Sequence, residues 1–181
     1  MRSEDIRATI RPLLRSIEAA AQGWTIGICS RNQMLLAVSA LLLEPCRVQA
    51  SSIAEFLAQP LPQQDRLLLL CDDECPDGGL EELLQQLRRI LGADRCRTVA
   101  FLAADVPQER LERIWRCGVE GMVSGSTLGG GALVRALLTV LRGHTSLDPL
   151  LRKRLQNPRV VEGSSGPAVE LSPREQELIL A

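Results

Sequence analysis

Short apolar runs alternate with amphipathic stretches along most of the chain. The apolar runs predict five buried strands, at residues 25–29, 47–50, 66–71, 98–103 and 119–124. Apolar residues at spacings of three and four predict helices after these strands, at residues 32–43, 52–58, 80–91, 108–117 and 132–142. Strands that alternate with helices in this way favour a parallel sheet covered by helices on both faces.

The order of the strands follows from how such units connect. Crossovers between parallel strands are right-handed, and five strand–helix units of this size fit an α/β, flavodoxin-like fold. We therefore expect a doubly wound five-stranded parallel sheet, with strand order 2-1-3-4-5, over residues 24–143. The working site of such a sheet lies beyond the carboxyl ends of its strands, so the residues that follow each predicted strand are the first candidates.

An additional amphipathic helix is predicted before the sheet, in an N-terminal segment of residues 1–23. Ile6, Ile10, Leu13 and Ile17 fall on one face of this helix. That face either packs on the sheet domain or contacts a second copy or a partner protein, and the pattern is compatible with both.

The chain becomes less regular after residue 143. Residues 146–156 predict another helix, and the run Gly-Ser-Ser-Gly-Pro at 163–167 has the composition of a flexible linker, so residues 144–170 are expected to be a helix and a linker. A last helix begins within residues 171–181. Ser172 can cap it, Pro173 suits its first position, and Glu175 can close a Ser-x-x-Glu capping box.

This C-terminal segment, Leu-Ser-Pro-Arg-Glu-Gln-Glu-Leu-Ile-Leu-Ala, resembles the opening of the DNA-binding domain of the LuxR/NarL/FixJ transcription regulators. Those domains begin Leu-(Ser/Thr)-Pro-Arg-Glu and need about fifty further residues to complete the helix-turn-helix. The resemblance implies that residues 171–181 are the incomplete start of such a domain. The preceding residues would then be the regulatory half of the regulator.

Residues 25–143 resemble the receiver domain of two-component response regulators. The resemblance is carried by the run Leu-Leu-Leu-Leu-Cys-Asp-Asp-Glu-Cys-Pro-Asp-Gly-Gly at 67–79 and by Cys-Gly-Val-Glu-Gly-Met-Val at 117–123. Receivers end their third strand in a phospho-accepting aspartate with a proline four residues later, and Asp72 with Pro76 matches this spacing. An alignment without a gap places Cys71 at the acceptor position instead.

Other receiver roles lack their usual residues. Where the family has an acidic pair that helps to hold Mg²⁺, this chain has Ser30 and Arg31, and Gly125 replaces the lysine that pairs with the phosphate. Ala103 replaces the hydroxyl that senses the phosphate. The resemblance therefore implies a degenerate receiver, or pseudo-receiver, that is not phosphorylated by the usual Asp/Mg²⁺ mechanism. We expect no catalytic residue, metal or cofactor.

Composition limits the partners. Net charge is −1, with 21 basic and 22 acidic residues, so the overall charge of the chain does not favour binding to nucleic acid. No apolar run is long enough to cross a bilayer and none resembles a secretory signal, so a cytoplasmic protein without membrane contact is expected. The six cysteines are scattered and are interpreted as small buried hydrophobic residues.

These observations favour the regulatory part of a LuxR/NarL-type transcription regulator rather than an enzyme. The resemblance implies a homodimer that binds DNA through a C-terminal domain absent from this chain, and it allows for a regulatory protein partner. Two alternatives stay open: a stand-alone pseudo-receiver that serves as a protein-interaction module, and a redox or small-ligand sensor that uses Cys71 and Cys75.

Overall fold

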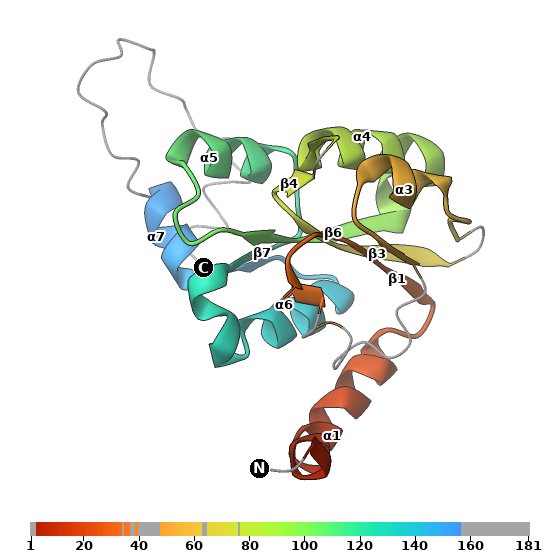
Figure 1. The fold of residues 1–181 in the computed structure, drawn as a ribbon, viewed down its shortest axis with the longest axis vertical. Coiled ribbons are helices and arrows are strands. Elements are labelled where there is room, and N and C mark those ends of the chain that lie inside the picture. The colour runs from red at the N-terminus through yellow and green to blue at the C-terminus, as the bar shows by residue number, and fades with distance from the viewer. Residues whose placement is uncertain are drawn as a thin grey trace.

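A six-stranded parallel sheet forms the centre of the molecule (Figure 1), in a computed structural model that describes residues 3–33, 35–36, 39, 48–62, 65–75 and 77–156. Its order is β2-β1-β3-β6-β7-β8. The strands are β1 (Trp24–Cys29), β2 (Val48–Ala50), β3 (Arg66–Asp72), β6 (Cys96–Leu102), β7 (Gly121–Ser124) and β8 (Ser146–Leu147). The first five strands have the predicted order 2-1-3-4-5, so the flavodoxin-like α/β class is confirmed.

The sixth strand is a difference from the sequence prediction, which placed a helix over residues 146–156. Ser146 and Leu147 instead pair with β7, and the helix α7 (Pro149–Gln156) begins only at Pro149. A proline suits the first turn of a helix but disfavours helical backbone in the residue before it, so the segment that leads into Pro149 is extended. A second, two-stranded antiparallel sheet follows β3, formed by β4 (Glu74–Cys75) and β5 (Gly78–Gly79).

Helices cover both faces of the sheet (Figure 1). One face carries α3 (Ile53–Ala58), α4 (Leu80–Leu91) and α5 (Gln108–Arg116), and the other carries α1 (Ser3–Ala20) and α6 (Ala132–Leu141). Two 3-10 turns, Ala93–Arg95 and Gly125–Gly130, lie between these elements. The helix predicted over residues 32–43 lies partly outside the described residues, although Gln33, Leu35, Leu36 and Ser39 are helical. No helix among the described residues has the length and apolar character needed to cross a membrane.

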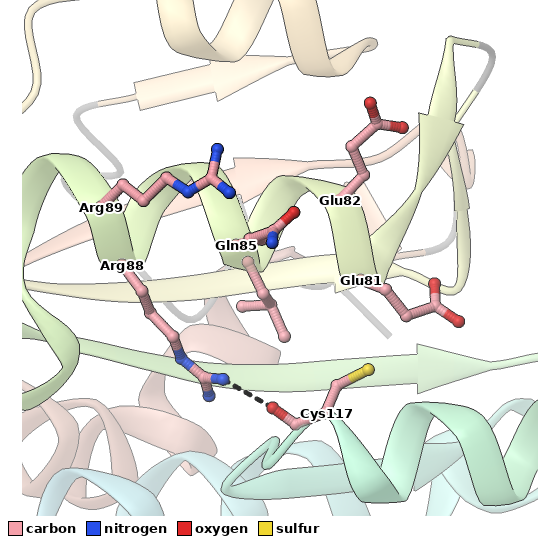
Figure 2. A pocket seen from close by; sticks show the side chains of 7 residues that line it. Glu81, Glu82, Gln85, Arg88, Arg89 and Cys117 are labelled. Atoms are coloured by element: carbon pink, nitrogen blue, oxygen red, sulfur yellow. Dashed lines mark hydrogen bonds between the residues drawn. The ribbon is translucent and has the colours of Figure 1, made fainter.

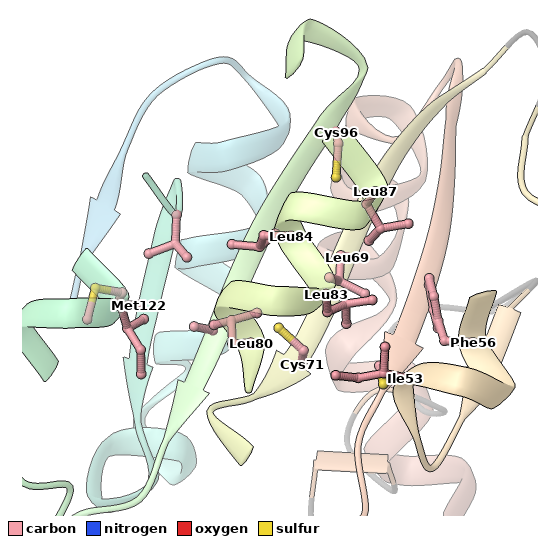
Figure 3. Close-up of a cluster of buried hydrophobic side chains, with 14 of the residues drawn as sticks. Ile53, Phe56, Leu69, Cys71, Leu80, Leu83, Leu84, Leu87, Cys96 and Met122 are labelled. Carbon is pink, nitrogen blue, oxygen red and sulfur yellow. The ribbon is translucent and has the colours of Figure 1, made fainter. Parts of the chain in front are cut away.

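The central strand β3 is buried on both sides and separates two hydrophobic clusters. Leu67, Leu69 and Cys71 belong to the cluster with α3 and α4, where Figure 3 shows Leu69 and Cys71, whereas Leu68 and Leu70 belong to the cluster with α6. All five side chains are fully buried. This explains why β3 is a continuous apolar run and not an alternating one.

The C-terminal half of the N-terminal helix packs on the sheet domain. Ile17 is buried in the cluster on the α6 side, and Leu13 and Leu14 pack against that cluster. For this half of α1, the structure supports packing on the sheet domain, one of the two interpretations left open above.

Candidate functional site

The carboxyl ends of β1 and β3 meet at one edge of the sheet. Cys29 and Cys71 are register partners in these parallel strands, so the residues that follow them, Ser30 and Asp72, lie side by side. The Ser30 hydroxyl donates to Oδ2 of Asp72 at 2.6 Å. The backbone amides of Arg31 and Asn32 point to the same oxygen, at 3.1 and 3.3 Å. One carboxylate oxygen therefore accepts from three groups at the end of β1.

The local sequence explains why these donors converge. The side chain of Asn32 accepts from the amide of Leu35 at 3.1 Å, which caps the helix that follows β1. The amide of Asn32 also donates to the Ser30 hydroxyl at 2.9 Å. The backbone amides of Arg31 and Asn32, just before this helix, thus face Asp72, and the start of a helix is a favourable place for a carboxylate.

The second oxygen of Asp72, Oδ1, is in a different situation. It is buried and has no hydrogen-bond partner among the described residues. Burial raises the pKa of the Asp72 carboxyl, and this effect exceeds the opposing effect of the three hydrogen bonds on Oδ2. The three hydrogen bonds therefore hold the Asp72 side chain in place, while its burial disfavours the charged form of the carboxyl group.

This raised pKa predicts how stability depends on pH. The folded protein binds the Asp72 proton more tightly than the unfolded chain does, so protonated Asp72 contributes to stability. This contribution is fully present below the pKa that Asp72 has in the unfolded chain. It is lost as pH rises through the folded pKa. We expect Asp72→Asn to remove this loss, so that the unfolding free energy of the variant relative to the parent increases from about pH 4 to about pH 7. Urea denaturation across this range measures the difference.

Ser30→Ala is the matched control for this prediction. It removes a hydrogen bond that lowers the pKa of Asp72, so it should extend the loss of stability to higher pH. Parallel pH profiles for the parent and Asp72→Asn would contradict the prediction.

The neighbouring acidic residues have partners of their own. Oδ2 of Asp73 lies 3.8 Å from Nε of Arg110 in α5, and the same guanidinium donates to the Asp73 carbonyl. Arg110 also lies 4.0 Å from Glu81 at the start of α4. Asp77 accepts from the amides of Ile53 and Ala54, both at 2.8 Å, at the start of α3, and these bonds lower the pKa of its carboxyl.

This arrangement does not fit the Mg²⁺ that receivers with the acidic pair hold. Ser30 occupies one of the two positions of the missing acidic pair, and Arg31 is exposed and offers its backbone amide to Asp72. Within the described ranges, no three His, Cys, Asp or Glu side chains are grouped so that they could hold a metal ion. The Ser30 hydroxyl and the amides of Arg31 and Asn32 direct hydrogens toward Oδ2, which suits a carboxylate acceptor, whereas Mg²⁺ needs several oxygen atoms directed toward it.

The remaining sequence candidates lie at the ends of β6 and β7. Ala103 follows β6 and is exposed. Gly125 follows β7, and a Cβ at this position would lie 3.4 Å from the carbonyl oxygen of Leu102. Neither residue has a hydroxyl or a cationic group, so these two positions have no side chain that binds an anion.

Cys71 and Cys75, the candidates for a redox or ligand sensor, lie in different surroundings. Cys71 is fully buried in the core beneath α4 (Figure 3), and burial raises the pKa of its thiol. Cys75 is half-buried in β4, and its Sγ lies 3.6 Å from Sγ of Cys29. Cys29 is the last residue of β1 and immediately precedes Ser30.

An open groove runs along α4 on the outside of the molecule (Figure 2), which the sequence did not indicate. Its lining residues are Glu81, Glu82, Leu84, Gln85, Arg88, Arg89 and Cys117. Arg88 donates to the carbonyls of Cys117 and Gly118, at 2.6 and 2.7 Å, so it fixes the turn between α5 and β7.

Comparison with known proteins supports the fold. No protein-family model and no curated protein matches the sequence. The isolated REC domain of RcsB from Salmonella enterica serovar Typhimurium, in the presence of phosphomimetic BeF3−, is similar with a TM-score of 0.60 and 15% identity over 71% of this chain and 96% of that chain. A LuxR-family two-component response regulator from Aurantimonas sp. SI85-9A1 has a TM-score of 0.62 and 16% identity, over 76% of this chain and 97% of its own.

A third structure is the RcsB response regulator of Salmonella typhimurium, described for its conformational dynamism for DNA interaction. It has a TM-score of 0.60 and 16% identity, and the match covers 86% of this chain and 75% of that chain. At such identities the similarity shows the fold alone. The chain has the fold of a response-regulator receiver domain.

Proposed function

We propose that this chain is the regulatory part of a LuxR/NarL-type transcription regulator, and that its receiver domain acts without phosphorylation by the usual Asp/Mg²⁺ mechanism. The observation that carries the proposal is the pocket of Asp72. Its Oδ2 is held by Ser30 and two backbone amides from the end of β1. The run Leu-Ser-Pro-Arg-Glu at 171–175, which resembles the start of a LuxR-type DNA-binding domain, also supports the proposal, although it lies outside the described residues.

The hydrogen bonds explain how such a domain would work. Transfer of a phosphoryl group needs positive charge to neutralise its oxygens, and in receivers a metal ion supplies much of that charge. Around Asp72 the side chain of Ser30 is neutral, and the charge of Arg110 is engaged with Asp73 and Glu81. The exposed Arg31 binds Asp72 through its backbone amide. Asp72 therefore serves as a structural acceptor that ties β3 to the end of β1, and the pocket remains in one state.

Regulation would then come from contacts with other molecules. We propose a homodimer in the cytoplasm that binds DNA through a C-terminal domain beyond this chain, with a further regulatory protein as a second partner. In this role the domain is a binding module and not an enzyme.

Treatment with acetyl phosphate and Mg²⁺ tests the central claim. We expect the intact mass of the protein to stay unchanged, and we expect beryllofluoride with Mg²⁺ to leave its thermal stability unchanged. A receiver domain that does accept a phosphoryl group, treated in parallel, is the positive control. An added phosphoryl group that requires Mg²⁺ and disappears in Asp72→Asn would overturn the proposal.

A further inference from the structure

Two thiols lie together beside the Asp72 pocket. Sγ of Cys29 and Sγ of Cys75 are 3.6 Å apart, and both cysteines are in the thiol form in this structure. Cys29 immediately precedes Ser30, and Cys75 lies three residues after Asp72. The pair therefore links the end of β1 to the hairpin that follows β3.

We propose that Cys29 and Cys75 are a redox site, at which a hydroperoxide converts the two thiols into a reversible intramolecular disulfide. The geometry needs only a local change, because the sulfur separation has to shorten from 3.6 Å to about 2 Å. This site is independent of the proposed function, since it requires neither a DNA-binding domain nor an inactive Asp72.

Cys75 lies in a less extensively paired element than Cys29. Cys29 lies in β1, which is paired on both sides by β2 and β3, whereas Cys75 lies in the two-residue strand β4. At the start of the hairpin, Asp73 forms an ion pair with Arg110. Near its turn, Asp77 accepts hydrogen bonds from the first backbone amides of α3. These contacts keep Cys75 over Cys29 while leaving β4 outside the main sheet.

The two thiols have different chemical roles. The hydrogen bond with Cys29 lowers the pKa of the half-buried Cys75 thiol, against the opposing effects of burial and of Asp72, Asp77 and Asp73. The same contact and burial raise the pKa of Cys29. Cys75 is therefore the thiolate that meets the oxidant, and Cys29 is the resolving thiol.

The reaction balances in two steps. The Cys75 thiolate attacks one oxygen of the hydroperoxide, the O–O bond breaks, and a sulfenic acid forms while the other oxygen leaves as water or an alcohol after taking a proton. The Cys29 sulfur then attacks the Cys75 sulfur, the S–O bond breaks, and the hydroxide takes the Cys29 proton and leaves as water. The peroxide is reduced by two electrons and the two thiols are oxidised to one disulfide.

The other described cysteines do not offer this arrangement. Cys71 and Cys96 are buried in the core, where burial raises the pKa of each thiol. Cys117 donates to the carbonyl of Arg113 at 3.2 Å, within its own helix end, and burial also raises the pKa of its thiol. These residues serve as internal controls.

Peptide mapping of the full chain after treatment with hydrogen peroxide tests the proposal. We expect one new cross-linked peptide pair that contains Cys29 and Cys75, the loss of two titratable thiols, and recovery of both with dithiothreitol. Cys75→Ser should abolish the cross-link and leave Cys29 as a thiol, whereas Cys117→Ser should form the cross-link at the parent yield. Because Cys75 is only half-buried, its serine variant is expected to fold, and circular dichroism verifies this.

Three outcomes would overturn the proposal. The first is oxidation of Cys75 to sulfinic acid with no cross-link. The second is a disulfide that joins other cysteines, including Cys46, or joins two chains, at equal or greater yield. The third is retention of all thiols under peroxide concentrations that oxidise free cysteine.

Discussion

Replacing Phe56 with alanine is expected to destabilise the protein by about 3–5 kcal/mol, because the ring is fully buried and its removal leaves a cavity. Phe56 projects from α3 into the cluster beneath α3 and α4 (Figure 3). Its ring lies over Gly27 of β1, where a Cβ would be 2.6 Å from Cζ. Gly27 has no side chain that could fill the space that the ring leaves. Urea denaturation monitored by circular dichroism measures the change.

A double-mutant cycle with Gly27 tests the physical cause. Gly27→Ala alone places a methyl group against the Phe56 ring and 3.3 Å from Leu67, and overpacking of this kind costs about 1–3 kcal/mol. In the Phe56→Ala background the same methyl group enters the cavity and should cost much less. We expect the two effects to be non-additive by at least about 0.5 kcal/mol. Additive penalties would show that Phe56 and Gly27 do not share this space.

The alternation of apolar runs and amphipathic stretches predicted the main elements because it reflects burial directly. The prediction of helix 80–91 agrees with α4 because its apolar residues recur on one buried face and glycines flank it at both ends. The strand order was also predictable, since it follows from general rules of connection. By contrast, β8 is two residues long and the β4–β5 hairpin pairs two residues with two. A strand of two residues is too short to show a periodic pattern of apolar and polar residues.

The site was predictable in part for a related reason. The rule that parallel strands end at a common edge directed attention to Ser30, Arg31 and Asp72, which the structure brings together. The contribution of Arg110 was not visible, because it lies on another helix, 37 residues from Asp73. The Cys29–Cys75 contact was not predicted, because it depends on how the hairpin places Cys75 against β1. Both contacts depend on side-chain geometry across distant segments, which spacing in one sequence does not encode.

A buried carboxylate near the end of the described residues also joins distant segments. Its replacement is the second change from which we expect a large effect. Asp148, between β8 and α7, is almost fully buried, at 5% exposure. Its carboxylate accepts from the amide of Leu150 at 2.8 Å, from the amide of Ser124 at 3.4 Å and from the Thr127 hydroxyl. One side chain thus caps α7 and ties it to the end of β7.

Asp148→Ala is expected to lower the unfolding free energy by about 2–4 kcal/mol, because each buried donor left without a partner costs about 1–3 kcal/mol. The loss of stability should be concentrated in the β8–α7 segment around residue 148. Other anchors of this segment include the strand pair β7–β8, the buried Leu151 and hydrogen bonds of Arg154 with Gln108 and with the Val106 carbonyl. Hydrogen exchange in residues 146–156 should therefore accelerate far more than in β1 or β3.

Asp148→Asn separates the hydrogen bonds from the shape of the side chain. Asparagine is nearly isosteric and keeps one acceptor oxygen, so it can retain the cap on Leu150 but not every contact with Ser124 and Thr127. We expect its loss of stability and its gain in exchange to lie between those of the parent and the alanine variant. Equal exchange rates in residues 146–156 for the parent and Asp148→Ala would contradict this account. The β8–α7 segment would then be held by apolar packing around Leu151 and by its pairing with β7, with no measurable contribution from the buried carboxylate.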